Sequence, residues 1–319
     1  MGKKQPTMLS VLIPTYNVNL HPLISELQPQ LNDCQIEYEI IIEDDMSSDG
    51  TICQHNSLLS EMDNVTYIKH TENLGRSKTR NHLADIAKFP YLLFLDCDAR
   101  VKHKFYIADY LRFIQSKQLE GVNFAVSGGL SYHSDRPSKD KMLRYKYGIH
   151  RELRSAAVRN CHPYHNFTPF NLLIAKSVFE SCRFDETVEG YGYEDTFFGI
   201  ELEEAGIPVF HIDNEMYHDG LDDNRTFLRK ITDSVRNLDK LYRDGKVNDR
   251  FLEQSRLLQT WKRYSESSAS SLVFGALKLM RPFITNLMLQ SNILKAMDMY
   301  KLLLFDDLRK SAINCWLCA

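Results

Sequence analysis

The first 130 residues alternate between two hydrophobic patterns. Short runs rich in apolar and β-branched residues predict strands at residues 8–13, 38–42, 65–69, 91–95 and 123–127. Between these runs, stretches such as 20–31 and 77–87 carry apolar residues at helical spacing. Strands that alternate with helix-length segments are typical of a mostly parallel, Rossmann-like sheet with flanking helices. We therefore predict an α/β fold and expect ligand-binding residues just after each strand, because ligands bind at the carboxyl ends of such strands.

The pattern becomes irregular at residues 131–168, which are rich in Tyr, His, Arg, Ser and Pro. We expect a mobile or partner-facing excursion there, with one helix over residues 142–158. Sheet-like and helical patterns then return. The predicted elements are a strand at 170–175, a helix from Glu194 to Gly206 and a strand at 208–212.

From Arg225 onward the spacing of apolar residues is helical. We therefore predict an α/β domain over residues 1–224 and a C-terminal helical region over residues 225–319. Residues 271–304 are strongly apolar but are interrupted by charged residues and a proline. This segment could form the core of a helical subdomain, a surface for a homo-oligomer, or an interfacial helix on a membrane.

Charge and composition narrow the class of protein. The chain has 319 residues and a net charge of -3, with 39 basic and 42 acidic residues, so we expect no nucleic acid as a partner. No run of about 20 apolar residues is present, and we expect no membrane-spanning helix. The seven cysteines are scattered without the spacing of a disulfide scaffold, which favours reduced thiols in the cytoplasm. Membrane contact would then be peripheral, at the inner face of the cytoplasmic membrane.

Acidic residues follow two of the predicted strands. Asp96 and Asp98 come directly after an apolar run, and Asp44 and Asp45 follow the second strand. Residues two apart in an extended chain point to the same side, so Asp96 and Asp98 could share a Mg²⁺ or Mn²⁺ ion. A solvated, helix-capping turn is the plain alternative for such a pair. Asp44 could accept hydrogen bonds from a nucleotide base.

Residues after the first and third strands also suit a nucleotide. Tyr16, flanked by Thr15 and Asn17, could offer a ring on which a base stacks. Asn73 opens a Gly-containing turn before a helix that carries Arg80. A helix N-terminus favours anions and arginine suits phosphate, although an exposed basic helix face would give the same pattern.

Glu194 and Asp195 follow the glycine-containing segment 190–193 and open a predicted helix. They could stabilise the helix N-terminus through its dipole, or place a general base near an acceptor hydroxyl. His218 is a single histidine before Asp219 and Gly220. It would become functional only as a third metal ligand.

Taken together, these motifs resemble the inverting family 2 glycosyltransferases of the GT-A fold over roughly residues 8–220. The family's P-x-Y-N, D-D-x-S-x-D-G-T, N-x-G-x-x-x-x-R-N, D-x-D and G-x-G-x-E-D motifs have counterparts here. They lie at residues 13–17, 44–51, 73–81, 96–98 and 190–195. One departure is Met46, where the family usually has glycine.

The resemblance implies a role for each matched residue. The nucleotide-sugar donor would be bound by Thr15, Tyr16, Asn17, Asp44, Asn73, Arg80 and Asp96. A divalent cation, Mn²⁺ or Mg²⁺, would be held by Asp96, Asp98 and His218. Asp195 would act as catalytic base, and Glu194 would help to position the acceptor.

The predicted activity is therefore metal-dependent, inverting hexosyl transfer. A UDP-sugar would be the donor and a glycan or lipid-linked glycan the acceptor, in bacterial cell-surface polysaccharide assembly. The alternative is a catalytically inactive protein of the same fold that binds a nucleotide sugar or another protein. A sugar-nucleotide-forming enzyme or a dehydrogenase would need a glycine-rich loop after the first strand, where residues 14–17 offer none.

Overall fold

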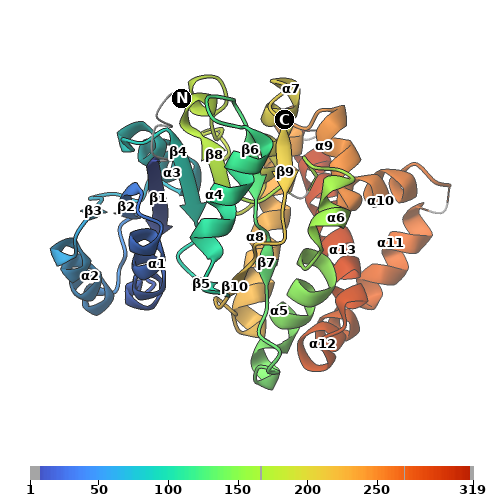
Figure 1. The fold of residues 1–319 in the computed structure, drawn as a ribbon. Coiled ribbons are helices and arrows are strands. Elements are labelled where there is room, and N and C mark those ends of the chain that lie inside the picture. Colours follow the sequence, from blue (N-terminus) through green and yellow to red (C-terminus); the bar gives the residue numbers. More distant parts are fainter. Residues whose placement is uncertain (1–7, 166, 269, 317–319) are drawn as a thin grey trace. The chain divides into compact units, whose positions relative to one another are not determined.

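The computed structural model describes residues 8–165, 167–268 and 270–316 (Figure 1). Contacts between residues divide the chain into two compact units, each built from separate stretches of sequence. Unit 1 comprises Met1–His133, Leu153–Thr187 and Glu194–Gly220. Unit 2 comprises Ser134–Glu152, Val188–Tyr193 and Leu221–Ala319. The predicted boundary at residue 224 lies close to the last change of unit, and as a limit between independently folding domains it stays a prediction.

Unit 1 is built on a seven-stranded sheet in the order β3-β2-β1-β4-β8-β6-β9. The strands are β1 (Met8–Thr15), β2 (Glu37–Asp44), β3 (Val65–Lys69), β4 (Tyr91–Leu95), β6 (Ala125–Ser127), β8 (Asn171–Ala175) and β9 (Val209–His211). All run parallel except β8, which is antiparallel to both neighbours. The predicted mixed α/β fold with a mostly parallel sheet is confirmed, and the reversed β8 is an addition that the pattern did not indicate.

A second, three-stranded sheet lies in the same unit, in the order β5-β10-β7. Its strands are β5 (Ala99–Val101), β7 (Leu130–Ser131) and β10 (Met216–His218). β10 is antiparallel to β5, and its register pairs His218 with Ala99. Because Ala99 follows Asp98, this pairing brings His218 beside the acidic pair although 120 residues separate them.

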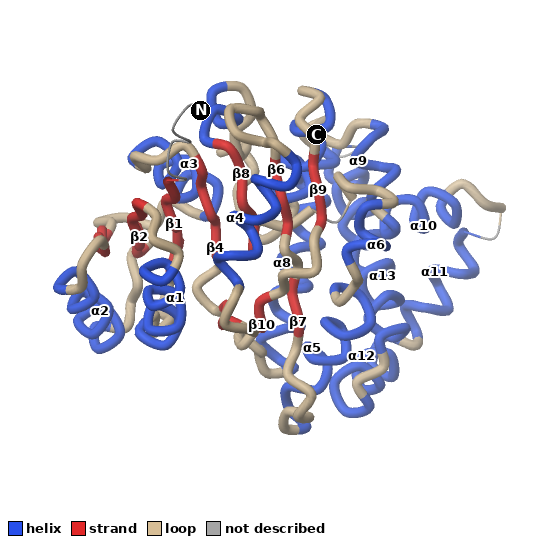
Figure 2. The backbone as a smooth tube through the Cα atoms, viewed as in Figure 1, coloured by secondary structure: helices blue, strands red, loops and turns tan. Residues whose placement is uncertain are grey.

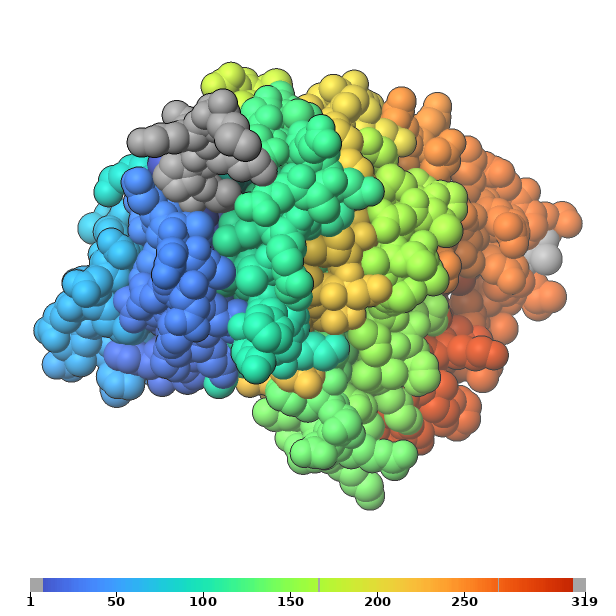
Figure 3. Space-filling model, viewed as in Figure 1, coloured from blue at the N-terminus to red at the C-terminus, as the bar shows by residue number. Residues whose placement is uncertain are grey.

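Helices cover both faces of the main sheet. They are α1 (His21–Asp33), α2 (Gly50–Ser57), α3 (Arg76–Ile86), α4 (Tyr106–Lys117), α6 (Ala156–Asn160) and α7 (Glu194–Glu204). α1 and α4 contact each other on one face and form its surface (Figure 2, Figure 3). The chain moves in opposite directions along the sheet from β1 to β2 and from β3 to β4, so right-handed crossovers place α3 on the other face from α1.

The main core of unit 1 consists of the two faces of this sheet and the helix residues packed on them. The central strands β1 and β4 read as near-continuous apolar runs, as expected for strands buried on both faces. In β4 all five residues are buried. The buried strands therefore fix the positions of the loops that follow their carboxyl ends.

Unit 2 is helical. Its elements are α5 (Met142–Tyr147), η3 (Gly148–Glu152), α8 (Asn224–Arg243), α9 (Asp249–Gln254), α10 (Arg256–Ser265), α11 (Ser270–Leu279), α12 (Arg281–Ser291) and α13 (Leu294–Trp316). A buried apolar cluster joins Leu143 of α5 to Phe227 and Ile231 of α8, Met288 of α12 and Met297 of α13. The single helix predicted over 142–158 is wrong: α5 passes into a π-helix at Gly148–Glu152, and Ser155 is extended where it caps α6.

Among the described residues, no one helix combines the length and apolar character needed to cross a bilayer. α11 and α12 meet that requirement only as a pair, and the pair is bent by 57°.

Candidate active site

The loops after β1 and β2 are tied together by Asn17. Its backbone N–H donates to Ser47 Oγ at 2.7 Å, and its side-chain amide donates to Ser48 Oγ at 3.0 Å. Its side-chain oxygen accepts from the Asp49 N–H at 2.9 Å. Asn17 itself adopts a left-handed conformation (φ 54°), which asparagine tolerates better than most residues. The ring of the preceding Tyr16 is left 49% exposed beside these loops.

Asp44 and Asp45 lie behind this surface and are buried. One oxygen of Asp44 accepts from the Ser47 N–H at 2.7 Å, and the other accepts from the Tyr67 hydroxyl. The two oxygens of Asp45 accept from the N–H groups of Leu74, at 2.5 Å, and Gly75, at 2.9 Å. Both carboxylates are thus hydrogen-bonded within the fold, and Asp45 anchors the turn that begins α3.

Two further residues complete these loops. The side chain of Asn73 donates to the Asp45 backbone carbonyl at 2.9 Å, so it supports the same turn. Met46 has a φ of 65°, in the left-handed region that favours glycine, and its side chain is exposed. Glycine would adopt that backbone conformation at lower cost, which accounts physically for its place in the related motif.

Arg80 on α3 joins two of the predicted site residues. Its guanidinium group donates to Asp96 Oδ1 at 2.9 Å and lies 3.5 Å from Glu194 Oε1. The same group packs over the Phe184 ring, 5.4 Å from its centroid, and is almost fully buried. Arg76, one turn earlier and half exposed, also reaches Glu194, at 3.4 Å. Two cations and two carboxylates therefore meet after β4 and at the start of α7.

Asp98 lies beside His218, with 3.7 Å between Oδ2 and Nε2. The imidazole stacks between the rings of Phe170, at 5.4 Å, and Tyr132, at 5.7 Å. Gly220 leaves space for the carboxylate, because a Cβ at that position would lie 2.0 Å from Asp98 Oδ2. The Asp98 side chain remains 29% exposed, so a ligand can reach it.

Asp195 occupies the first turn of α7, and one of its oxygens accepts from the Thr196 N–H at 2.7 Å. Burial, and then the neighbouring Glu194 carboxylate, raise the pKa of Asp195 to about 7, against the opposing effect of Arg80 and Arg76. A carboxylate that titrates near neutral pH is suited to general base catalysis. The same residue also lies in the first turn of α7, where a carboxylate stabilises the helix N-terminus.

The glycine-containing segment before α7 belongs to unit 2. Gly190, Gly192 and Tyr193 all have positive φ angles, between 79° and 91°. The side chain of Asn237 on α8 donates to the Gly192 carbonyl at 3.0 Å. Gly190 is also close to Asn237, because a Cβ there would lie 3.3 Å from that side chain. The loop is thus held by α8 through its backbone.

The predicted metal ligands do not all converge. Asp96 is drawn toward Arg80, whereas Asp98 and His218 face each other. The donors of Asp98 and His218 fit Mn²⁺, which accepts oxygen ligands and an imidazole, and phosphate oxygens of a substrate could fill further positions. Both carboxylates are about one-third exposed, which suits an ion shared with a ligand.

A second cluster was not predicted. Glu43, His70 and His82 have ligand atoms within 4.8 Å of one another, the one such group of three found in the described part of the chain. These residues come from the end of β2, the residue after β3 and the middle of α3. The sequence shows no spacing that would unite them, since the two histidines lie 27 and 39 positions from Glu43.

Comparison with known proteins identifies the family. The model of the family described as Glycosyl transferase family 2 matches residues 10–180. Over 94 residues the chain is 37% identical to poly(ribitol-phosphate) beta-glucosyltransferase of Bacillus spizizenii. That match covers 28% of this chain and 14% of the relative. The matched stretches span between 14% and 37% of the lengths of three curated relatives.

Solved structures extend the likeness in fold to nearly the whole chain. The crystal structure of S. aureus TarS 1-349 aligns with a TM-score of 0.52 at 16% identity, covering 96% of this chain and 92% of that one. The mannosyltransferase PcManGT from Pyrobaculum calidifontis, in complex with GDP-Man and Mn²⁺, aligns with a TM-score of 0.54 at 17% identity. The latter alignment covers 93% of this chain and 88% of the mannosyltransferase.

Proposed function

The chain belongs to glycosyl transferase family 2 and is a glycosyltransferase, and from that premise we propose that it uses a UDP-sugar as donor. The sugar moves to an acceptor hydroxyl with inversion at the anomeric carbon. The choice of UDP follows from the resemblance of the motifs, and the observation that carries transfer from a nucleoside-diphosphate sugar is the cluster in which Arg80 joins Asp96 to Glu194, next to Asp195. It combines a buried cation for a diphosphate with a carboxylate that titrates near neutral pH.

The donor lies along the carboxyl ends of β1, β2 and β4. The half-exposed Tyr16 ring stacks on the base, beside Thr15 and Asn17. Asp44 is buried behind this surface and holds the loop at Ser47 in place through a hydrogen bond. Asn73 holds the turn before α3 in place in the same way. Asp96 contacts the ribose, and Arg80 faces the phosphates with a planar group suited to them.

Asp98 and His218, with Asp96 nearby, would hold the divalent cation, Mn²⁺ or Mg²⁺. When bound, such an ion stabilises the charge that develops on the departing diphosphate. The bound Mn²⁺ of the PcManGT complex supports this assignment, as does the exposure of both carboxylates. Arg80 acts on the same developing charge from the protein side.

Asp195 accepts the proton of the acceptor hydroxyl while that oxygen attacks the anomeric carbon. The bond to the diphosphate breaks as the new glycosidic bond forms, so one displacement inverts the configuration. Glu194 supports this step by holding Arg80 and Arg76 and by keeping the pKa of Asp195 raised. The acceptor is a glycan or lipid-linked glycan, and the named activity of the Bacillus spizizenii relative supports bacterial polysaccharide assembly.

We further propose that the enzyme works in the cytoplasm at the inner face of the membrane, through unit 2. α11 and α12 expose large apolar side chains, with Leu279 87% and Leu272 77% exposed. Phe283 is also exposed, and Lys278 lies among these residues, where it reaches Asp307 at 3.9 Å. Apolar side chains flanked by basic ones are typical of helices that lie on an anionic membrane surface.

Calorimetric titration with UDP and GDP, with and without Mn²⁺, tests the donor site. We expect UDP to bind only with the metal, to lose that binding in Asp98→Ala, and to keep it in Asp195→Asn. Asp195→Asn should lower transfer by about 10²- to 10⁴-fold, the usual contribution of a general base. Asp109→Ala, on the surface of α4, is the matched control and should behave as the wild type.

Tight binding of UDP in the presence of a chelator would contradict the metal assignment. Binding of GDP in preference to UDP would correct the nucleotide. Normal nucleotide binding with no transfer to any glycan acceptor, in the wild type as in Asp195→Asn, would support the inactive relative instead.

Vesicle flotation tests the membrane proposal separately. The wild type should float with anionic vesicles and Leu279→Glu should not, whereas Val158→Glu changes an exposed apolar residue of unit 1 and should have no effect. Sedimentation of the same variants shows whether α11 and α12 instead join copies of the chain into a homo-oligomer.

A further inference from the structure

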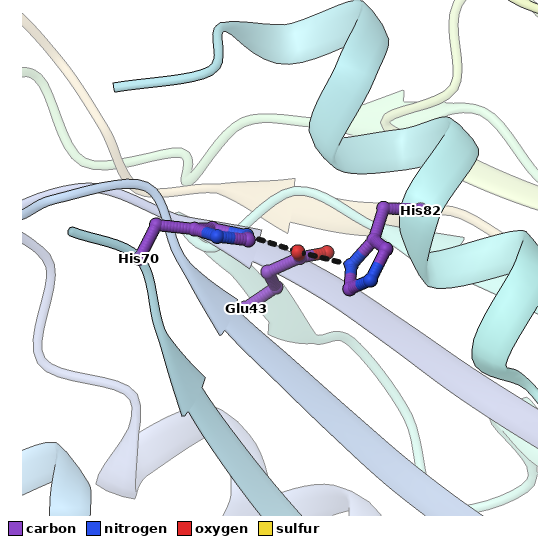
Figure 4. A group of neighbouring side chains, drawn as sticks. All are labelled: Glu43, His70 and His82. Carbon is purple, nitrogen blue, oxygen red and sulfur yellow. Dashed lines mark hydrogen bonds and ion pairs between the residues drawn. The ribbon is translucent and has the colours of Figure 1, made fainter. Parts of the chain in front are cut away.

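The cluster of Glu43, His70 and His82 lies outside the residues assigned to donor, metal and acceptor, although it shares elements with them. Glu43 is the penultimate residue of β2, His70 follows β3, and His82 belongs to α3. Figure 4 shows the two imidazoles approaching the Glu43 carboxylate from opposite sides. His82 Nδ1 lies 2.6 Å from Glu43 Oε1, and His70 Nε2 contacts the same oxygen.

The burial of Glu43 makes a positive charge necessary. Its side chain is fully buried, and a buried carboxylate is costly unless a cation offsets its charge. The ion pairs described for Glu43 are those with His70 and His82, and no lysine or arginine is among them. The second oxygen, Oε2, is also buried and has no hydrogen-bond partner in the described part of the chain. A metal ion bound between these three side chains would offset that charge.

We propose that Glu43, His70 and His82 bind a zinc ion. Two imidazole nitrogens and one carboxylate oxygen are a ligand set that Zn²⁺ prefers, with about 2.0–2.2 Å from the metal to each ligand. Ligands at such distances lie roughly 3–4 Å apart. The three residues are now closer than that, since His82 Nδ1 lies 2.6 Å from Glu43 Oε1. The ion requires the imidazoles to withdraw from Oε1, and the unpartnered Oε2 offers it a second contact.

The position of His82 gives the site an opening. Its side chain is 44% exposed, whereas that of His70 is 17% exposed. Zinc can enter from the side of α3, and a water molecule can complete its coordination there. No sugar-transfer role is implied, because Glu43 and Asp44 are adjacent in a strand and point to opposite faces of the sheet.

The ion would connect the three elements that carry the donor side of unit 1. β2 leads to the Asp44 and Asp45 loop, and α3 carries Arg80 two residues before His82. Zinc at this place would fix α3 against β2 and β3, and so would keep Arg80 in position. The expected effect is on stability and order rather than on the chemical step.

Metal-stripped full-length protein should take up one equivalent of Zn²⁺ in calorimetry, and its melting temperature should rise when zinc is added. His82→Ala and His70→Ala should bind zinc at least about 100-fold more weakly, because even partners beyond the direct ligands typically contribute 10- to 100-fold. The melting temperature of both variants should no longer respond to zinc. Glu43→Gln, which keeps the size of the side chain, should also lose the zinc response.

Two control variants exclude the other sites where zinc could bind. Asp98→Ala removes a ligand of the proposed catalytic metal and should keep the zinc response. His55→Ala removes one ring of an exposed pair that His55 forms with His21, and should also keep it. Because Asp98→Ala separates the two metal sites, failure of zinc binding and failure of the proposed donor site give different results.

The proposal is overturned if the wild type takes up no zinc near stoichiometric concentrations, or if His82→Ala binds it as well as the wild type. His82 lies on the surface of α3, so this variant should fold, as its circular dichroism spectrum will show. Either negative result would leave the three side chains as a hydrogen-bonded cluster without a metal ion.

Discussion

Two pairs of aspartates follow strands β2 and β4, which flank β1 in the main sheet. The two pairs differ in the groups that surround their carboxylates. Asp44 and Asp45 after β2 are buried, and backbone N–H groups and a tyrosine hydroxyl occupy their oxygens. Asp96 and Asp98 after β4 keep about one-third of their side chains exposed. Their described partners are the side chains of Arg80 and His218, both of which can also meet a ligand.

The difference shows how the same residue type serves two purposes at one edge of a sheet. A carboxylate whose oxygens accept from buried N–H groups contributes to stability and shapes a loop. A carboxylate that faces other charged side chains at the surface can exchange them for a metal ion or a phosphate. The comparison therefore separates residues whose loss should unfold a loop from residues whose loss should stop catalysis.

Within the comparison of the two acidic pairs, the largest effect should come from Asp98→Ala. We expect transfer activity to fall by about 100- to 1000-fold, as when one group that stabilises developing charge is removed. The free energy of unfolding should change by less than about 0.5 kcal/mol, because the side chain is partly exposed. Steady-state kinetics and urea denaturation measure the two quantities. A large loss of stability would remove the distinction between the two pairs.

Asp45→Ala should show the opposite behaviour. It deprives the N–H groups of Leu74 and Gly75 of their acceptor, and each buried donor left without a partner costs about 1–3 kcal/mol. We expect a loss of about 2 kcal/mol in urea denaturation, since water can reach part of this loop. Asp49→Ala, which removes an exposed N-cap of α2, is the control and should cost about 1 kcal/mol. Unchanged stability in Asp45→Ala would argue that the turn needs no anchor.

Gly220→Ala tests whether Asp98, in the partly exposed pair Asp96 and Asp98, needs its present side-chain position to bind the metal ion. A Cβ at Gly220 would lie 2.0 Å from Asp98 Oδ2, so the carboxylate must swing away. We expect affinity for Mn²⁺ in the presence of UDP to fall by about tenfold, comparable to the loss of a supporting contact at a metal site. Gly50→Ala is the control, since a Cβ there meets no atom within 4 Å. Equal metal affinity in both variants would show that Asp98 can bind the ion from another rotamer.

The smallest effect should be a shift in pH dependence. Asp195 must be ionised to act as a base, so kcat/KM should rise with pH through an apparent pKa near 7. Glu194→Gln removes a like charge and should lower that pKa by about one unit, leaving the effect of burial. A profile of kcat/KM against pH measures the shift, whatever the absolute rate of the variant.

The raised pKa of Asp195 also makes the free energy of unfolding depend on pH. Its pKa in the folded state lies above the value of 3.8 for a free aspartate, so its contribution to stability is present in acid and is lost as pH rises through about 7. Asp195→Asn should therefore be more stable than the wild type at pH 8 and not at pH 4. If the kcat/KM profile against pH is the same in Glu194→Gln as in the wild type, the better interpretation is that Glu194 and Asp195 only stabilise the N-terminus of α7.

Much of the main sheet could be predicted from the sequence. The bounds of β3 and β4 agree with the predicted runs. For β4 the reason is that a strand buried on both faces is a short apolar stretch that ends abruptly at polar residues. The direction of β8 could not be predicted, since hydrophobic alternation is the same whichever way a strand runs. β5, β7 and β10 escaped prediction because each is short and mixes apolar with polar residues, so that none forms an apolar run.

The candidate site was predicted in part. The residues named from motifs lie near strand ends, and contacts between Arg80 and Asp96 and between Asp98 and His218 join four of them. What the pattern could not show is which acidic residues the fold itself would use, because Leu74 and Gly75 reach Asp45 only after α3 has packed. Glu43, His70 and His82 were missed for a similar reason, since three elements must meet before they become neighbours.

The interleaved make-up of unit 2 bears on how the protein is made. Its residues come from 134–152, 188–193 and 221–319, so its early segments leave the ribosome well before the helices they pack on. Leu143, for example, must wait for Phe227 and Met297 before it is buried. Domains fold as units during synthesis, with N-terminal ones first, so unit 1 can complete its sheet while the apolar face of α5 is still uncovered. Translation speed across the last hundred codons, and chaperones that shield α5 in that interval, should therefore govern the yield of folded enzyme.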